Sequence, residues 1–517
     1  MPRYKDCSRD QDMMIPISFK KQLQPGTFEW TLDHIIEHHV EVAPFEKKLK
    51  NDQTGAPAWN PKVMLKIILF GYSRGLVSSR DIEAACRENI IFMALSAYSQ
   101  PHFTTISDFI SGMKEEVRAV FISVLTLCDE LGLIGGELFA IDGCKFSSNA
   151  SKEWSGTKEE LKKKKEKMEK TVDFLLKRHT ASDENENASF LKQSHETQKN
   201  QVEHLKKKIK KIDDWLKDND DKPGSSGKVR KSNITDNESA KMKSSRGYIQ
   251  GYNGVSTADE KYQIILHAEA YGEGDHHVLQ DSVQRLKENL NEIGKEELLK
   301  KVKFTADSGF HTKDNVEWME QNGIDAYLPD KNFRKRDPRF ADADKYKKDC
   351  EKNHENKPRR FYGPKSFHWD PVRQKMICPA GNEMYIKNSH FKMQEQKYFG
   401  FIGKKTDCRV CPLRDRCQRN ETSEQRQVYF LIENLDQKNS LTEKMKNKID
   451  SIFGKWVYSK RMKVIEPVFA NIRHNLGLNR FTLRSKAKVN IQWNLFNIVH
   501  NIGKILSFGS IPVWNTV

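Results

Sequence analysis

Residues 138–149 read LFAIDGCKFSSN. Four apolar residues lead up to Asp142, and a lysine and two serines follow it. A short apolar run that stops near a glycine is typical of a buried strand. Because a carboxylate is costly to bury alone, one that leaves the core at a strand end must be paired, bind a metal ion or take part in chemistry. We therefore expect Asp142 to be a functional residue at a strand end.

Two further acids extend this pattern. Residues 301–310, KVKFTADSGF, predict a second apolar strand that ends in Asp307. Late in the chain Glu466 precedes Pro467, and proline is tolerated best in the first turn of a helix, which predicts Glu466 at a helix N-terminus. Three carboxylates from two strand ends and a helix can hold two divalent cations, and Mg²⁺ prefers such oxygen ligands.

Each acid also has an ordinary explanation. Gly143 directly follows Asp142, and Asp307 begins the sequence Asp-Ser-Gly, so both aspartates suit turns. Glu466 would complement the dipole of its helix if it lay in the first turn. From these residues alone, both explanations stay open.

The bulk composition indicates a polar protein with a polyanionic partner. The 517 residues include 88 Lys and Arg against 71 Asp and Glu, a net charge of +17, and the pI is about 9.2. This excess fits nucleic acid, although a solvated lysine-rich surface has the same composition. No apolar run reaches membrane length and no signal peptide is recognisable, so we expect a cytoplasmic protein without a membrane partner. Nine cysteines without such a leader argue against a disulfide framework.

Sequence patterns divide the chain into six segments. Residues 1–132 have helical periodicity and predict a domain that binds DNA ends, dimerises or does both. Residues 133–152 contain the first strand. Residues 153–222 are lysine-rich and predict an inserted helical hairpin, because Val202, Leu205, Ile209, Ile212 and Leu216 are spaced as a short coiled-coil seam.

The remaining segments complete an α/β fold. Residues 223–330 give, with the first strand, the order of three strands, helix, strand, helix, strand. Residues 331–440 form a basic, Cys-rich insertion, and residues 441–517 are helical. The predicted fold is a mixed sheet with helices, interrupted by the hairpin and the Cys-rich insertion and preceded by an all-α domain.

Four cysteines cluster in the basic insertion. Cys378, Cys408, Cys411 and Cys417 follow the spacing C-x29-C-x2-C-x5-C. Thiolates at C-x2-C spacing can both reach one tetrahedral Zn²⁺, and four close a structural site. The sequence predicts structural zinc here, with reduced, unpaired thiols as the alternative. Neighbouring arginines could follow a DNA backbone without reading its sequence: Arg409, Arg414, Arg416 and Arg419.

Several blocks carry a family resemblance. Residues 139–156, 245–259, 305–319 and 464–481 resemble the signature blocks of bacterial insertion-sequence transposases of the DDE class. Residues 59–89 resemble the helical N-terminal domain of that group. The resemblance implies an RNase H-like catalytic domain, completed by the C-terminal helices, that cuts and joins double-stranded DNA at terminal inverted repeats and at a target. It also implies two Mg²⁺ or Mn²⁺ ions, a homodimer or larger synaptic complex, and a bacterial, nucleoid-associated enzyme.

The resemblance assigns roles residue by residue. Asp142, Asp307 and Glu466 match the family's two catalytic aspartates and its glutamate, which bind the metal ions. The family's tyrosine-arginine-glutamate-lysine pattern has its nearest match in Tyr458, Arg461, Glu466 and Arg473. The gap between Arg461 and Glu466 is one residue longer than usual, and arginine replaces the lysine.

Other residues are expected to contact DNA. Arg461, Arg473 and His474 lie around Glu466 in the sequence and suit a phosphate. Arg246 and Asn253, on the strand expected beside that of Asp142, could position a phosphate or a base. For the last two, a plain structural role is an equal alternative.

Two other functions remain open at this stage. One is a catalytically silent, domesticated descendant that only binds DNA, and the other is a related metal-dependent nuclease that does not join strands. The three intact acids argue against the first. Nothing in the sequence separates the second from a transposase.

Overall fold

The computed structural model falls into two compact units, and each is described by itself. The first contains Met1–Phe310, Gly323–Ala326 and Ser459–Val517, and the second contains His311–Asn322 and Tyr327–Tyr458. The structure describes residues 16–510 except 49–56, 183–189, 224–228, 245–246, 341–360, 364–365, 371–372, 374, 394–395, 419, 421 and 432–439.

The N-terminal part of the first unit is helical, as predicted. The helices are α1 (Phe19–Gln22), α2 (Phe28–His38), α3 (Ala43–Glu46), α4 (Pro61–Ser73), α5 (Ser79–Glu88), α6 (Ile90–Leu95), α7 (Phe103–Gly112) and α8 (Lys114–Glu130). Helix α4 is buried along most of its length, including Lys66. The Lys66 ammonium lies 2.5 Å from carboxylate oxygens of both Asp33 and Glu37 on α2, which compensates its burial.

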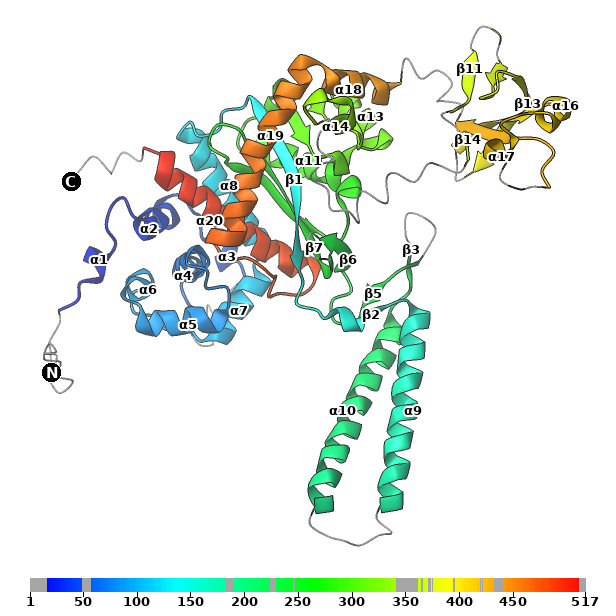
Figure 1. The fold of residues 1–517 in the computed structure, drawn as a ribbon. Helices are drawn as coiled ribbons and strands as arrows, with labels where there is room; N and C mark the ends of the chain where they lie inside the picture. Colours follow the sequence, from blue (N-terminus) through cyan, green and yellow to red (C-terminus); the bar gives the residue numbers. More distant parts are fainter. Residues whose placement is uncertain are drawn as a thin grey trace, which may run out of the picture. The chain divides into compact units, whose positions relative to one another are not determined.

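A six-stranded mixed sheet follows (Figure 1). Its strands are β1 (Leu138–Ser147), β6 (Ala240–Ser244), β7 (Gly247–Asp259), β8 (Ile265–Tyr271), β9 (Lys303–Ala306) and β10 (Asp325–Tyr327). The order is β10-β9-β1-β7-β6, and β8 also pairs with β7. Strand β7 is long enough to pair with β6 through its first half and with β8 through its second. The predicted order of strands and helices is therefore found, with β6 as an additional strand.

Two long helices pack against this sheet. Helix α11 (Asp275–Glu292) follows β8, and after it come α12 (Leu298–Lys301) and, beyond β9, the short turn η2 (Ser308–Phe310). Helix α20 (Lys486–Phe508) packs on β8 and on α8. Its Asn490 and Asn501 accept hydrogen bonds from the backbone amides of Ala270 and Ile265 at 2.6 and 2.8 Å. These side chains thus provide hydrogen-bond acceptors for backbone amides of β8 that do not bond to β7.

Helix α19 (Ile452–Ala470) corrects the prediction for Glu466. Pro467 lies inside this helix, so Glu466 is in its last part and not at its N-terminus. Proline at this position removes the hydrogen bond to the carbonyl of Lys463, four residues earlier. The side-chain amide of Gln263 donates to that carbonyl at 2.9 Å, so the helix continues through the proline. A π-helical turn, Asn471–Asn475, follows directly.

The lysine-rich segment forms two long helices. These are α9 (Lys158–Ser182) and α10 (Phe190–Asp218), which contact each other. Short elements lie at their base: η1 (Lys152–Trp154), β2 (Ser155–Gly156) paired with β5 (Ser232–Asn233), and β3 (Lys222–Pro223) paired with β4 (Val229–Arg230). Leu161, Ile212 and Trp215 form a buried cluster between the helices, so part of the predicted seam is core.

The second unit contains helices and an antiparallel sheet. The helices are α13 (Lys313–Gln321), α14 (Phe333–Arg336), α16 (Lys405–Arg409), α17 (Arg414–Cys417) and α18 (Leu441–Asp450), with the turn η3 (Pro338–Phe340). The sheet follows the order β11 (His368–Asp370), β12 (Lys375–Ile377), β13 (Glu383–Met393), β14 (Gln396–Gly403) and β15 (Gln427–Leu431). Among the helices that the structure describes, none combines the length and the apolar character needed to cross a lipid bilayer.

A buried histidine on α20 makes the stability of the first unit sensitive to acid. The Nδ1 atom of His500 lies 3.0 Å from the side-chain amide nitrogen of Asn471, and its Nε2 lies 3.0 Å from the carbonyl oxygen of Gln263. These partners fit the neutral ring with its proton on Nε2. Burial lowers the pKa of His500 to about 4. In the unfolded chain a histidine titrates near 6.5.

We predict that the variant His500→Gln flattens this pH dependence. Between pH 6.5 and 4 the unfolded chain binds the proton and the folded chain does not, so acidification lowers the free energy of unfolding by about 1.4 kcal/mol per pH unit. Urea unfolding at pH 7.5 and 5.0 should show the wild type losing about 2 kcal/mol more than the variant. Parallel losses in both proteins would contradict a neutral His500.

Candidate active site

Strand pairing brings the two predicted aspartates together. The parallel pairing of β1 with β9 ends at Ile141 and Ala306, so Asp142 and Asp307 are the next residues on neighbouring strands. Strand β9 stops there, whereas β1 continues to Ser147 and pairs with β7 throughout. Asp142 therefore lies in the middle of β1, which corrects the expectation of a strand end. From Asp142 onward, β1 is no longer paired with β9 and keeps its pairing with β7.

The third acid joins them through an arginine of α19. The Nη1 atom of Arg461 lies 2.6 Å from the Oδ2 atom of Asp142. Its Nη2 atom lies 3.9 Å from Asp307 Oδ1 and 4.0 Å from Glu466 Oε1. The three predicted acids thus gather around one guanidinium. The Arg461 side chain is only 6% exposed, whereas that of Glu466 is 51% exposed, so the cluster has a buried and an open side.

The environment of Asp142 favours its protonated form. Burial raises the pKa of Asp142 to about 6, and the nearby Asp307 adds to this increase. The Arg461 guanidinium and the backbone amide of Gly143, which donates to Asp142 Oδ1 at 2.8 Å, act in the opposite direction. A carboxyl with this pKa is half ionised at pH 6. An added cation would therefore bind better as the pH rises above that value.

The donor set fits divalent cations, and a guanidinium now lies within it. Within the described residues, no three His, Cys, Asp or Glu side chains are arranged to hold a metal ion as they stand. In the acidic cluster, the guanidinium of Arg461 is the cation on which the carboxylates converge. Carboxylate oxygens are the ligands that Mg²⁺ and Mn²⁺ prefer. The residues therefore fit such ions if Arg461 moves away.

Arg473 lies beside this cluster, as the sequence suggested. Its Nη1 atom lies 3.5 Å from the sulfur of Cys144, and its guanidinium lies 5.4 Å from the ring centre of Phe146. Cys144 and Phe146 follow Asp142 at alternate positions of β1, so all three side chains are on one face of the strand. A phosphate that approaches Asp142 along this face would meet Arg473.

The other residues predicted to contact DNA lie in different surroundings. His474 is exposed, next to Arg473. Asn253 is buried on β7 and donates to Asp275 at 2.8 Å, so it has a structural contact. Arg246 lies outside the described residues. Tyr458 belongs to the second unit, where its ring packs edge-on against Phe333.

Asp275 is a residue of this region whose part in the site could not be recognised from the sequence, which shows only that it begins a helix. Asp275 is the first residue of α11, and its carboxylate lies against Gly143 and Gly309, which closely follow the two aspartates. The three-dimensional approach of α11 to the middle of β1 and to the turn after β9 makes it a candidate.

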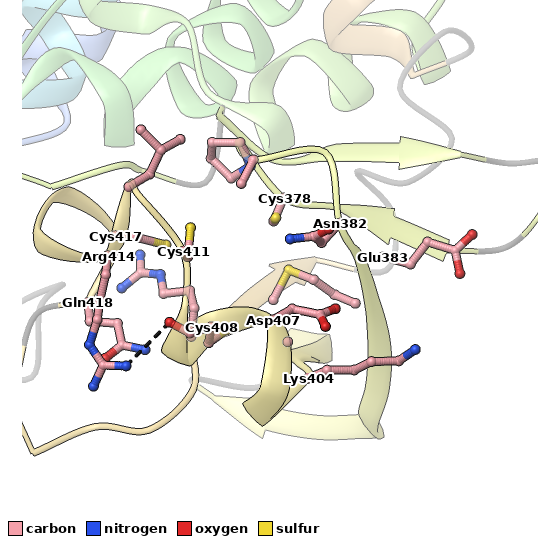
Figure 2. Close-up of a pocket in the computed structure, with 16 residues that line it drawn as sticks. Cys378, Asn382, Glu383, Lys404, Asp407, Cys408, Cys411, Arg414, Cys417 and Gln418 are labelled. Carbon is pink, nitrogen blue, oxygen red and sulfur yellow. Dashed lines mark hydrogen bonds between the residues drawn. The ribbon is translucent and has the colours of Figure 1, made fainter.

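The four clustered cysteines line one small cavity in the second unit. Figure 2 shows Cys378, Cys408, Cys411 and Cys417 around it, and its volume is about 30 Å³. Cys378 follows β12 in a tight turn closed by the amide of Gly381. Gly403 leaves room for the cluster, because a Cβ atom there would lie 2.9 Å from the sulfur of Cys408.

The thiols are close enough to influence one another. Burial raises the pKa of the Cys417 thiol, and the other three cysteines add to the increase, whereas Arg426 opposes it. All described cysteines are free, including these four.

The arginines near the cysteines are held within the second unit. Arg414 donates to the carbonyls of Cys408 and Ser423 at 3.3 Å, and Arg409 pairs with Glu424 at 3.1 Å. Arg416 lies over the ring of Tyr362. Arg419 is outside the described residues.

Comparison with protein families adds an independent finding. Residues 377–506 match the family model described as a transposase DDE domain, and residues 17–112 match the one described as a transposase domain (DUF772). The first match includes Arg461, Glu466 and the four cysteines, and Asp142 and Asp307 lie between the two matches. No curated protein and no solved structure gives a significant match. The two matches together indicate an insertion-sequence transposase of the DDE class.

Proposed function

We propose that the chain binds the terminal inverted repeats of its element, cuts a DNA strand there and joins the freed 3′-hydroxyl to target DNA, using two divalent metal ions. One observation carries the proposal: Asp142, Asp307 and Glu466, far apart in the sequence, converge on a single cationic group. The order of strands and helices around them is consistent with an RNase H-like catalytic domain.

We assign the metal-binding and phosphate-binding roles to the following residues. Asp142 is central and would be shared by both ions, with Asp307 and Glu466 each completing one site. When bound, the ions supply an activated water or 3′-hydroxyl on one side of the phosphate and stabilise the leaving oxygen on the other. Arg473 and a displaced Arg461 would hold the phosphate oxygens through charge-assisted hydrogen bonds.

The remaining parts of the proposal concern partners and location. The net charge of +17 supports double-stranded DNA as the partner, at both element ends and target. Bringing two ends together requires at least a homodimer in the synaptic complex. Because its proposed DNA substrate is the bacterial chromosome, we place the enzyme in the cytoplasm, associated with the nucleoid.

Two alternatives are tested by the same experiment. A silent DNA-binding descendant would bind the ends without cutting, and a related nuclease would cut without joining. The convergence of three intact acids favours an active enzyme over the first alternative.

We predict that Asp142→Asn, Asp307→Asn and Glu466→Gln each abolish strand cleavage. Loss of one carboxylate removes a ligand from a site whose ions contribute several kcal/mol to the transition state, which corresponds to about a thousandfold in rate. The measurement is cleavage and joining of a duplex that carries the element's ends, with Mg²⁺ and without it.

Glu288→Gln is the matched control, because Glu288 is an exposed acid on α11 away from the cluster. It should cleave at the wild-type rate. Metal-independent cleavage, or full activity of Asp142→Asn, would refute the proposal, and cleavage without joined products would identify a nuclease.

The position of Arg461 gives a second prediction. Arg461→Met removes the guanidinium on which the three acids converge, so the free energy of unfolding of the metal-free protein should fall by about 1–3 kcal/mol. Because a metal ion no longer has to displace the guanidinium, Mg²⁺ should raise the Tm of the variant more than that of the wild type. Differential scanning calorimetry with and without Mg²⁺ measures both. Equal shifts in the two proteins would show that Arg461 does not compete with the metal.

We also propose that the four cysteines bind one structural Zn²⁺. Among the residues that the structure describes there, the sheet has a small core of five buried residues: Phe367, Met376, Met384, Phe401 and Val428. Cores of this size usually need a metal or disulfides for stability. Cys378 and Cys417 pack against this core, so a metal there would tie the loops to the sheet.

Elemental analysis tests the zinc proposal. The purified wild type should contain one zinc per chain, and Cys411→Ser and Cys417→Ser should lose it and become sensitive to proteolysis in the Cys-rich segment. Cys7→Ser, distant in the sequence, should keep the metal. A wild type without zinc would leave four reduced thiols as the better description.

A further inference from the structure

Asp275 lies where two glycines leave space for it. A Cβ atom on Gly143 would stand 2.7 Å from Asp275 Oδ1, and one on Gly309 would stand 3.1 Å from Asp275 Oδ2. Neither glycine has the positive φ that favours glycine. Gly143 is paired within β1, not in a turn, so the absence of a side chain serves the close approach of this carboxylate. Gly143 follows Asp142 directly, and Gly309 is two residues after Asp307.

A buried amide accompanies Asp275. The Nδ2 atom of Asn253 donates to Asp275 Oδ1 at 2.8 Å, which fixes the carboxylate. Asn253 is fully buried, and its Oδ1 atom has no hydrogen-bond partner in the described part of the chain. This oxygen would lie 2.5 Å from a Cβ on Gly143, so it faces the same space as Asp275. A buried acceptor without a donor is costly, and a cation would satisfy it.

The end of β9 leaves a gap in the sheet beside Asp142, on the side where Asp275 lies against Gly309. Side chains alternate along a strand, so Gly143 faces the side of β1 opposite to Asp142. The pairing of β1 with β9 stops at Ile141 and Ala306. Because β9 ends there, it does not lie between side chains on the two faces of the sheet next to Asp142 and Gly143. Helix α11 contacts η2, the turn that follows Asp307.

We propose that Asp275 is a fourth carboxylate of the divalent cation site, with Asn253 holding it in place. The inference rests on the proposed two-metal function and deepens it. Two divalent cations carry four positive charges, and Asp142, Asp307, Glu466 and Asp275 together carry four negative ones. With Asp275 in the site, Arg461 is not needed to balance charge once the ions are bound and is available for DNA phosphate.

Titration with Mn²⁺ tests this inference without DNA or turnover. The full-length protein is titrated by isothermal calorimetry and by electron paramagnetic resonance of free Mn²⁺. Asp275→Asn keeps the shape of the side chain and its acceptor for Asn253 but removes the charge. We expect its affinity for Mn²⁺ to fall about tenfold or more, with an unchanged Tm in the metal-free state.

Asp314→Asn is the matched control. Asp314 is an exposed acid in the first turn of α13, so it shares any helix-dipole role of Asp275, but it is not one of the acids that converge on Arg461. It should bind Mn²⁺ as the wild type does. If Asp275→Asn also binds Mn²⁺ normally while Asp142→Asn does not, the fourth-carboxylate inference is overturned and the proposed function stands. If Asp142→Asn binds normally as well, the proposed metal site itself is wrong.

Discussion

The structure around the candidate site depends on one electrostatic constraint: three ionised carboxylates that share a partly buried space repel one another and need a compensating cation. Arg461 meets this constraint from within the chain, because its guanidinium contacts Asp142 directly and lies within 4.0 Å of the other two acids. Its effect on Asp142 is incomplete, since burial still raises the pKa of that carboxyl to about 6. The acids are therefore held together but remain under-neutralised, which is the condition in which a site takes up further positive charge.

The rest of the first unit holds these four groups in position. The register of β1 and β9 makes Asp142 and Asp307 neighbours. Helix α19 carries Arg461 and Glu466, and the side-chain amide of Gln263 donates to the Lys463 carbonyl that Pro467 leaves without its helical partner. The carbonyl of Gln263 is in turn bonded by His500 of α20, and α20 is fixed to β8 through its asparagines. The turn around Gln263 thus connects α19, α20 and the sheet.

Much of this could be predicted from local sequence, and the exceptions have physical reasons. The apolar runs before Asp142 and Asp307 were sufficient to predict two strands, and the family resemblance assigned their roles. The expectation for Glu466 was wrong because the rule for proline considers only the helix, whereas a distant side chain supplied the missing partner. The sequence suggested a turn at Gly143, because a sequence does not show which atoms of other elements lie close to a strand. The central position of Arg461 depends on the fold of α19 over β1, and no spacing along the chain reveals it.

Arg461 also connects the two ligands of the proposed reaction. The Arg461 guanidinium now occupies the Oδ2 atom of Asp142, so it would compete with a divalent ion held by the same carboxylate. A displaced guanidinium on a side chain that is almost fully buried needs another anion nearby, and a DNA phosphate next to Arg473 would supply it. Each ligand then lowers the cost of binding the other, and thermodynamic linkage makes this effect reciprocal. In this account, one arginine stabilises the acids before the ions arrive and favours the simultaneous presence of metal and DNA afterwards.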